Sequence, residues 1–190
     1  MHNLAIMSVR DLLKNFDLSH HRHVADTGGG SGGLVIGLTG ALPELAVTII
    51  DLPAVIPIAQ SHLENAPNRE RIHLVTGNAV EQPISGTYDG AFMRSFTQIL
   101  SPEQIKLALR HTFDALTSGG VLYIVAQMLD DDRVTPPTTA TFNLVFLNAY
   151  DEGRAFTEGE YRTWLTEAGF TQIERHAPPR GESILRAVRP

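Results

Sequence analysis

The chain has 190 residues, which suffices for one domain with a substantial core but is short for two independent domains. Hydrophobic residues make up 43% and charged residues 19%, a composition that excludes a disordered chain, and the absence of cysteine excludes disulfides and thiolate nucleophiles. The net charge of -6 provides no broad basic surface, so DNA and RNA are not expected partners. No stretch approaches the roughly 20 apolar residues of a membrane span, and residues 1–13 lack the pattern of a secretion signal. The sequence therefore predicts a cytoplasmic protein without membrane contact.

Short apolar runs alternate with helical patterns along the chain, which is typical of crossover units on a parallel sheet. We therefore expect an α/β fold. Candidate strands are residues 23–26, 46–51, 72–76, 90–93 and 121–126. A late pair, residues 172–176 and 183–188, is expected to form an antiparallel edge.

Three histidines, His20, His21 and His23, cluster just before the first strand. Such a cluster could bind a metal, but it precedes the strand on the side away from its carboxyl end, where ligands bind in open α/β sheets. We therefore expect a solvated surface turn. His111, on a later helix, is expected to face solvent.

Glycines at 28, 29, 30, 32 and 33 follow the first strand, and a helical stretch begins at Leu34. Residues without a Cβ allow a tight turn and a close approach of the backbone to a ligand. The helix behind the turn offers free N–H groups and the positive end of its dipole. This pattern is typical of a nucleotide-binding turn.

Two classes of cofactor compete for the turn. Gly28, Gly30 and Gly33 satisfy the dinucleotide fingerprint, and Asp51 follows at the distance of a ribose-binding acid. Asp26 argues for a different ligand, because a carboxylate before the glycines would repel a pyrophosphate yet attract the ammonium group of a methionine moiety. We therefore expect a cofactor with a methionine moiety rather than a dinucleotide.

The helix after Ser101 has a clear start signal. Ser101 with Pro102 and Gln104 combines an N-cap, a first-turn proline and a capping box. Its apolar residues recur at helical spacing: Ile105, Leu109, Phe113 and Leu116. We expect the glycines at 119–120 to end this helix.

Residues 130–141 contain three consecutive aspartates at 130–132 and two prolines, Pro136 and Pro137. The aspartates could suggest a metal site, but adjacent side chains rarely converge on one ion. We predict a solvent-exposed loop and no metal. A second capping box, Thr157 with Glu160, then opens a helix that Gly169 ends. Its Tyr161, Trp164, Leu165 and Ala168 are expected to pack in the core.

Several of these runs together resemble one family. Residues 24–32 (VADTGGGSG), Pro43 and residues 51–56 (DLPAVI) resemble the small-molecule O-methyltransferases of the caffeic acid and acetylserotonin type. Further similar segments lie at residues 77–78, 92–94, 118–120 and 156–161, so the resemblance covers nearly the whole chain. It implies a Rossmann-like class I methyltransferase sandwich with a mostly parallel seven-stranded sheet, an antiparallel C-terminal strand and S-adenosylmethionine as cofactor.

By this resemblance, the glycine turn wraps the methionine part of the cofactor and Asp51 binds both ribose hydroxyls. Asn78 and Ala79 border the adenine, and Arg94 lies near the carboxylate. Asn78 replaces the family's usual aspartate, but an amide can still pair with the adenine edge. The implied cofactor-binding residues are Asp26, Gly28, Gly29, Gly30, Gly32, Asp51, Leu52, Asn78, Ala79 and Arg94.

Family members carry an N-terminal domain for dimerisation and substrate binding, which the resemblance implies is missing from this chain. We accordingly divide the chain into a linker helix, residues 1–21, and an S-adenosylmethionine-binding methyltransferase domain, residues 22–190. Either the sequence is a fragment, or another chain completes the substrate pocket. The expected partners are a small-molecule acceptor and either a second copy of this chain or a separate chain that supplies the missing domain.

The resemblance also implies that the family's catalytic base is replaced here. Gln98 stands where the family commonly has a histidine, and Gln127 and Ala155 stand where it has the flanking carboxylates. Glutamine does not act as a general base near neutral pH. We therefore predict that no phenol is deprotonated in the family's usual way. Gln98 is expected to orient the acceptor by hydrogen bonding, and Gln127 is a second candidate catalytic residue.

Three functions remain open from the sequence. The first is methyl transfer to an aromatic or polyketide-like acceptor, promoted by proximity. The second is cofactor binding without methyl transfer, as in a cyclase, pericyclase or hydroxylase or in a non-catalytic module. The third, a nicotinamide-dependent reductase, is disfavoured because the chain has no Tyr-x-x-x-Lys. By the resemblance, Phe142, Leu144, Phe146 and Leu147 border an apolar acceptor, although core packing explains them equally well.

Overall fold

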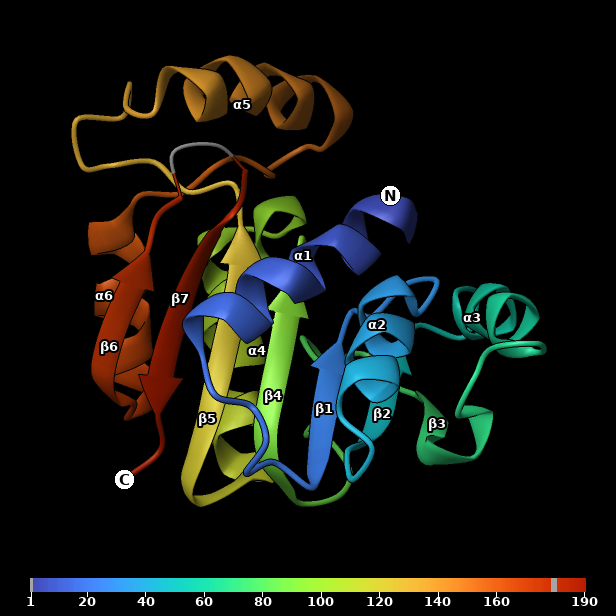
Figure 1. The fold of residues 1–190 in the computed structure, drawn as a ribbon. Coiled ribbons are helices and arrows are strands. Elements are labelled where there is room, and N and C mark those ends of the chain that lie inside the picture. Colours follow the sequence, from blue (N-terminus) through green and yellow to red (C-terminus); the bar gives the residue numbers. More distant parts are fainter. Residues whose placement is uncertain (1, 179–180) are drawn as a thin grey trace.

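The computed structural model describes residues 2–178 and 181–190. One seven-stranded sheet runs through the molecule in the order β3-β2-β1-β4-β5-β7-β6 (Figure 1). The strands are β1 (His23–Thr27), β2 (Ala46–Asp51), β3 (Ile72–Thr76), β4 (Tyr88–Arg94), β5 (Leu116–Ala126), β6 (Thr171–His176) and β7 (Ser183–Val188). Neighbouring strands are parallel except that β7 is antiparallel to both β5 and β6. The predicted α/β fold, its seven strands and the antiparallel C-terminal strand are confirmed.

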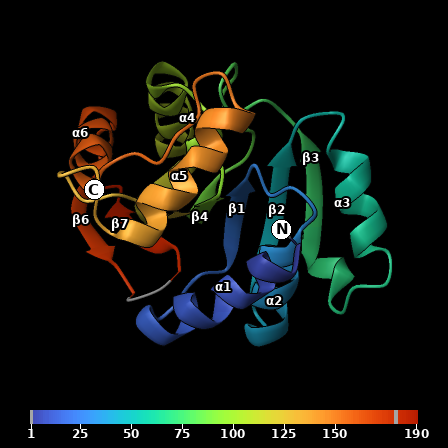
Figure 2. The same cartoon turned by 90° about the horizontal axis from the view of Figure 1, so that it is seen from above.

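Helices cover both faces of the sheet. They are α1 (His2–Asn15), α2 (Gly33–Ala41), α3 (Ile56–Leu63), α4 (Pro102–Ala115), α5 (Pro137–Ala149) and α6 (Glu158–Ala168), with short 3-10 turns η1 (Arg69–Arg71) and η2 (Thr97–Ile99). Side chains alternate between the two faces of a strand. Phe92 and Tyr123 therefore join the core under α1, α2 and α3, whereas Met93 and Ile124 join the core under α4 and α6. α5 belongs to neither layer and lies above the carboxyl ends of the strands (Figures 1 and 2).

Both predicted capping boxes are present. Ser101 caps α4 and Thr157 caps α6, and each accepts a hydrogen bond from the N–H group three residues ahead. Gly169 ends α6 with a φ of 104°. The four apolar residues of α6 are buried, as expected: Tyr161, Trp164, Leu165 and Ala168.

The predicted end of α4 at residues 119–120 is wrong. The helix ends at Ala115, and β5 begins at Leu116, so the two glycines lie within the strand. Leu116 already has an extended backbone, and the guanidinium of Arg189 caps this end by donating to the carbonyl oxygen of Phe113 at 2.9 Å and to that of Leu116. A side chain from the far end of the chain thus satisfies carbonyl groups that the end of a helix leaves without an intrahelical partner.

The predicted loop at residues 130–141 is correct only in its first half. α5 begins at Pro137, and Thr139 within it is buried. Pro137 takes the first helical position, where the missing N–H of proline has no cost and its fixed φ suits the helix. The two prolines that suggested a loop therefore mark a helix start.

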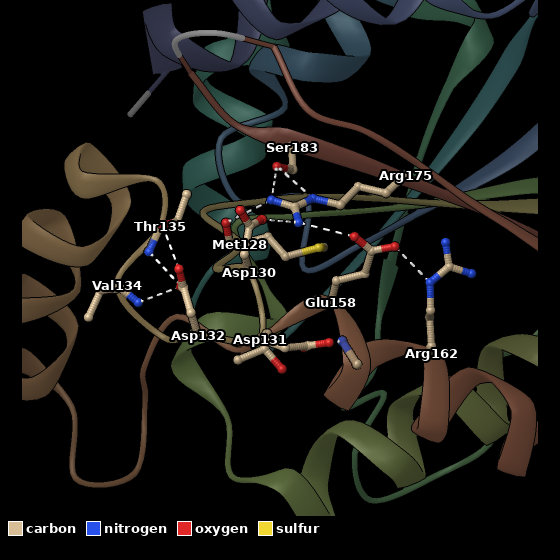
Figure 3. A network of polar contacts seen from close by, with 12 residues as sticks. Met128, Asp130, Asp131, Asp132, Val134, Thr135, Glu158, Arg162, Arg175 and Ser183 are labelled. Carbon is tan, nitrogen blue, oxygen red and sulfur yellow. Dashed lines mark hydrogen bonds and ion pairs between the residues drawn. The ribbon is translucent and has the colours of Figure 1, made fainter.

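The three aspartates at 130–132 have separate partners (Figure 3). Asp130 pairs with Arg175 at 2.6 Å, and Asp131 accepts a hydrogen bond from the backbone N of Gly159 at 2.9 Å. Asp132 accepts hydrogen bonds from N–H groups further along its own loop. Within the described ranges, no group of three acidic or histidine side chains could hold a metal ion. In the same ranges, no helix is long and apolar enough to cross a membrane.

The expectation of a solvated histidine turn is wrong for His21. Its side chain is buried, and its ring nitrogens lie 3.2 Å from Asp89 Oδ1 and 3.2 Å from the Tyr123 hydroxyl. Burial, and next the nearby His20, lower the pKa of His21 below its ordinary value of 6.5, although Asp89 opposes the shift. As predicted, the cluster lies at the amino end of β1, away from the glycine turn.

The pH dependence of stability follows from this burial. Because its folded pKa is lowered, neutral His21 stabilises the fold fully above about pH 6.5, and this contribution is lost as the pH falls further. We expect the free energy of unfolding of the wild type to fall, relative to His21→Gln, by up to about 1.4 kcal/mol per pH unit below that point. Urea unfolding at several pH values between 7.5 and 5 measures this difference. The exposed His62→Gln is the control, and equal slopes for all three proteins would contradict the argument.

Candidate functional site: a ligand-binding turn at the carboxyl edge of the sheet

The glycine turn follows β1 at the carboxyl edge of the sheet. Gly28, Gly30 and Gly32 have positive φ angles of 70°, 56° and 77°. A Cβ on Gly28 would lie 2.3 Å from a ring carbon of Phe96, whereas a Cβ on Gly30 would meet nothing within 4 Å. The turn is therefore packed against protein at its start and open to a ligand at Gly30.

The turn leads directly into α2, as the sequence predicted. Gly32 is the N-cap residue of α2 and, as a glycine, has no side chain that could cap the helix. The first turn of α2 contains no acidic residue. The positive end of the helix dipole therefore faces the turn without a capping side chain.

Asp51 ends β2 and holds the glycine turn in shape. Its Oδ2 accepts a hydrogen bond from Gly30 N at 2.8 Å, and its Oδ1 accepts one from Leu52 N at 2.8 Å. A carboxylate has about four acceptor positions, so two remain for a ligand. Asp51 can therefore shape the turn and accept hydrogen bonds from a pair of hydroxyl groups at the same time.

Asp26 is a buried acid, only 1% exposed. Neither of its carboxyl oxygens, nor the hydroxyl of Thr27, has a hydrogen-bond partner among the described residues. Burial, and next the negative charge of Asp51, raise the pKa of Asp26 to about 7, while Arg94 opposes the shift. Buried polar groups are normally paired, so this carboxyl group fits a ligand that brings a cationic donor.

Arg94, at the end of β4, is already paired within the chain. Its Nη2 lies 2.9 Å from Glu182 Oε2, and its Nε donates to Ser8 Oγ at 2.9 Å. Ser95 Oγ donates to the other oxygen of Glu182 at 2.9 Å. The ion pair between Arg94 and Glu182 thus joins the end of β4 to the segment before β7, and the hydrogen bond to Ser8 adds α1. The predicted position of Arg94 near a cofactor carboxylate stays a prediction.

Asn78 and Ala79 lie next to Asp51, after the neighbouring strand β3. Gly77 N donates to the Asp51 carbonyl at 2.9 Å, which brings the two strand ends together. Asn78 Oδ1 accepts a hydrogen bond from Val80 N at 3.0 Å. His111 Nδ1 lies 2.8 Å from the carbonyl oxygen of Ala79, so the expectation that His111 faces solvent is wrong. α4 packs beneath this loop, and His111 contacts it directly.

The two candidate catalytic glutamines are joined in the structure. Gln98, in η2, is 3% exposed, and its Oε1 accepts a hydrogen bond from Gln127 N at 3.2 Å. Gln127 Oε1 in turn accepts one from Thr139 Oγ1 at 3.0 Å. Ala155 is buried, and its N donates to Asn143 Oδ1 at 2.6 Å. Gln127 and Ala155 therefore contact α5 directly, and Gln98 is linked to it through Gln127.

The apolar residues of α5 divide between core and surface. Phe146 is buried with Leu129 and Ala155 in a small cluster of its own. The exposed apolar residues of α5 and the position after it are Phe142, Leu144, Val145, Leu147 and Tyr150, each at least 44% exposed. Core packing therefore explains Phe146, whereas the remaining residues are exposed on α5, which lies above the strand ends (Figure 2).

Sequence reasoning missed three residues of the site: Thr27, His111 and Glu182. Thr27 directly follows Asp26, so its place at the end of the same strand was a usable signal. Glu182 lies 88 positions after Arg94, and no local pattern links the two. His111 contacts a loop 32 positions earlier, which helical spacing alone does not reveal.

The sheet order reverses between β1 and β4, where the glycine turn lies, and open α/β sheets bind their ligands at this point. Fold and site together define a cofactor-binding α/β domain. Residues 1–171 match the O-methyltransferase domain family, and the chain belongs to that family. The family resemblance found in the glycine turn and in residues 51–56 is confirmed.

Two curated relatives are similar over most of this chain. The 3-hydroxy-5-methyl-1-naphthoate 3-O-methyltransferase of Streptomyces sahachiroi is 29% identical over 185 residues, covering 96% of this chain and 53% of that protein. The acetylserotonin O-methyltransferase of Gallus gallus is 30% identical over 165 residues, covering 87% and 47%. The crystal structure of the S-adenosylmethionine-dependent methyltransferase SibL in its apo form matches with a TM-score of 0.89 at 29% identity, covering 100% of this chain and 57% of that one. This chain thus spans about half the length of the curated relatives it matches.

Proposed function

We propose that this chain is the S-adenosylmethionine-binding domain of an enzyme that methylates a small aromatic or polyketide-like acceptor. The observation that carries the proposal is Asp26, a buried carboxyl group without a partner among the described residues, beside an open glycine turn. SibL is S-adenosylmethionine-dependent by name, and the Streptomyces sahachiroi relative is named for a hydroxynaphthoate. In this proposal, residues 1–21 are a linker helix and residues 22–190 are the catalytic domain.

The site residues fit this cofactor, which supplies an activated methyl group on a sulfonium when bound. Asp26 accepts its ammonium group, because an ionised carboxylate in a buried site needs a cationic partner. Asp51 accepts hydrogen bonds from the two ribose hydroxyls through its remaining acceptor positions. Asn78 and Ala79 border the adenine, and the exposed Leu52 covers the cofactor's apolar side.

Titration calorimetry with S-adenosylmethionine, S-adenosylhomocysteine and NADH tests the cofactor. We expect binding of the first two in the micromolar range and none of NADH, because the carboxylate of Asp26 repels a pyrophosphate. Binding of NADH in their place would favour a nicotinamide-dependent enzyme and overturn the proposal.

Proximity is the main source of rate acceleration in the proposed mechanism. Holding two reactants in line can supply roughly 7 to 11 kcal/mol of the barrier. The Oε1 of Gln98 is engaged by Gln127 N, so the amide N–H groups of Gln98 remain to orient the acceptor. A glutamine removes no proton, so the acceptor is one already ionised near pH 7, an amine or an activated carbon.

Replacing Gln98 with alanine tests this role. We expect the rate of methyl transfer to fall about three- to tenfold, the effect of losing one orienting hydrogen bond. Gln60→Ala, at an exposed position of α3, is the matched control and should leave the rate unchanged. An unchanged rate for Gln98→Ala on the true acceptor would remove the residue from the mechanism.

A second function is supported by the same three replacements at positions 98, 127 and 155. A protein without the family's base could bind the cofactor and promote a cyclisation, a pericyclic reaction or a hydroxylation, or have no catalytic activity. In either case the cofactor would persist and no S-adenosylhomocysteine would form. Chromatography of the reaction mixture distinguishes these outcomes from methyl transfer.

The exposed apolar residues of α5 support an acceptor pocket that a further chain completes. Because such exposed apolar surfaces commonly bind a partner, we propose that a second copy of the chain or a separate chain completes the pocket. Light scattering of the purified protein separates a homodimer from a monomer.

A further inference from the structure

We propose that Arg175 is a positioning residue for the acceptor side of the site, because its guanidinium joins the two chain segments that border α5. The proposal rests on the proposed function only in its consequence for the acceptor. Arg175 lies in β6, and nothing places it in contact with acceptor or cofactor. Figure 3 shows its side chain at the centre of a polar network.

The Arg175 guanidinium is 7% exposed and has partners on three sides. Its Nη1 lies 2.6 Å from Asp130 and 3.1 Å from Glu158. Its Nη2 donates to the carbonyl oxygen of Met128 at 3.2 Å and to Ser183 Oγ at 3.2 Å. One planar group thus pairs with two carboxylates and donates to a backbone carbonyl at the same time.

These partners lie on both sides of α5. Met128 and Asp130 belong to the segment that leads from β5 into α5, and Glu158 begins α6 just after the segment that leaves α5. The two segments also contact each other directly. Leu129 N donates to the Phe156 carbonyl at 2.9 Å, and Glu158 N donates to the Leu129 carbonyl at 3.0 Å. Arg175 therefore stabilises the contact between the two segments that flank α5.

α5 is otherwise held by a small set of contacts. Its buried Phe146 packs with Leu129 and Ala155 in a cluster separate from the two main cores. Thr139 donates to Gln127, and Asn143 accepts from Ala155 N. The position of α5 over the strand ends thus depends strongly on its two connecting segments, and so on Arg175.

The contact with Met128 extends this effect to the proposed acceptor site. Met128 directly follows Gln127, whose N donates to Gln98. If the Met128 carbonyl loses its donor, the end of β5 can shift, and the hydrogen bond that orients Gln98 shifts with it. Lysine cannot replace Arg175 here, because a single ammonium group cannot match the fork that reaches two carboxylates and a carbonyl.

The experiment compares Arg175→Lys and Arg175→Gln with the wild type, with Arg110→Lys as control. Arg110 is exposed, and its ion pair with Asp114 at 3.2 Å lies within its own helix. Hydrogen exchange of residues 137–149 reports on α5, and exchange of residues 102–115 reports on the core. Calorimetry gives the affinity for S-adenosylhomocysteine, and kinetics with 2-hydroxy-1,4-naphthoquinone, whose hydroxyl is already ionised near pH 7, as the acceptor probe give KM and kcat.

For both Arg175 variants we expect exchange in α5 to rise about tenfold or more while exchange in α4 stays unchanged. The affinity for S-adenosylhomocysteine should stay within about twofold, and KM for the acceptor probe should rise more than kcat falls. Unchanged exchange in α5, or an equal rise in both helices, would overturn the proposal. Failure of the wild type to bind S-adenosylhomocysteine would overturn the proposed function, and the exchange data would still decide whether Arg175 holds α5.

Discussion

Replacing Asp51 with alanine should weaken the binding of S-adenosylmethionine by at least about 100-fold. Hydrogen bonds to a charged acceptor contribute about 1.5 to 3 kcal/mol each, and the proposed pair of ribose hydroxyls would lose both. The variant also loses the hydrogen bonds from Gly30 N and Leu52 N that shape the turn. The loss of affinity therefore has a direct part and a part that comes from a less ordered turn.

Titration calorimetry of Asp51→Ala against the wild type measures the loss, and urea unfolding of both proteins shows how much stability the turn loses. Asp51→Asn keeps the size of the side chain, yet places an amide donor where one of the two backbone N–H groups now donates. It should therefore also weaken binding. Asp114→Ala, at an exposed position of α4, is the control. Affinities within about threefold of the wild type for both Asp51 variants would contradict the proposed ribose contact.

Local signals in the sequence predicted most of the fold. The capping boxes at Ser101 and Thr157 lie within four residues of the helix starts they determine, so they are visible in the sequence. The apolar strands are short runs bounded by turn residues, and most were found close to their observed bounds, although β5 begins at Leu116 rather than at residue 121. The end of α4 was not predicted in this way: β5 begins directly after Ala115, before the glycines, and Arg189, which caps this end, lies more than 70 positions away.

The site residues likewise divide into those with a local signal in the sequence and those without one. The glycine turn and Asp51 were recognisable because a run of glycines after one strand and an acid at the end of the next are visible in the sequence. The pairing of Arg94 with Glu182 and the contact of His111 with Ala79 join distant segments, and only the folded chain brings them together. Asp26 was identified from the sequence, but the lack of a partner for its carboxyl group depends on how β1 is buried between β2 and β4.

Replacing Asp26 with asparagine should stabilise the free protein at alkaline pH and weaken cofactor binding. Burial is the main reason that the pKa of Asp26 rises to about 7 from an ordinary value of 3.8. Because the folded pKa of this acid is raised, the ionised form is disfavoured in the folded state, and the wild type loses stability as the pH rises from about 4 to about 7. Asparagine carries no charge, so the variant avoids this loss.

The free energy of unfolding of Asp26→Asn, relative to the wild type, should therefore rise by about 1.4 kcal/mol per pH unit between pH 5 and 7 and then level off. Urea unfolding at pH 5, 6, 7 and 8 measures this slope. A constant difference between the two proteins would contradict a raised pKa.

Asp26→Asn should weaken cofactor binding even though it stabilises the free protein. S-adenosylmethionine brings an ammonium group that pairs with the ionised carboxylate, so its affinity for the wild type should increase as the pH rises from 6 to 7.5. Asp26→Asn should bind at least about tenfold more weakly at pH 7.5 and lack this increase, because an amide provides no full charge to pair. Calorimetry of both proteins at the two pH values, with Asp114→Asn as control, tests this expectation. Equal affinities at pH 7.5 would mean that Asp26 does not face the ammonium group, and its buried carboxyl group would then require a different partner.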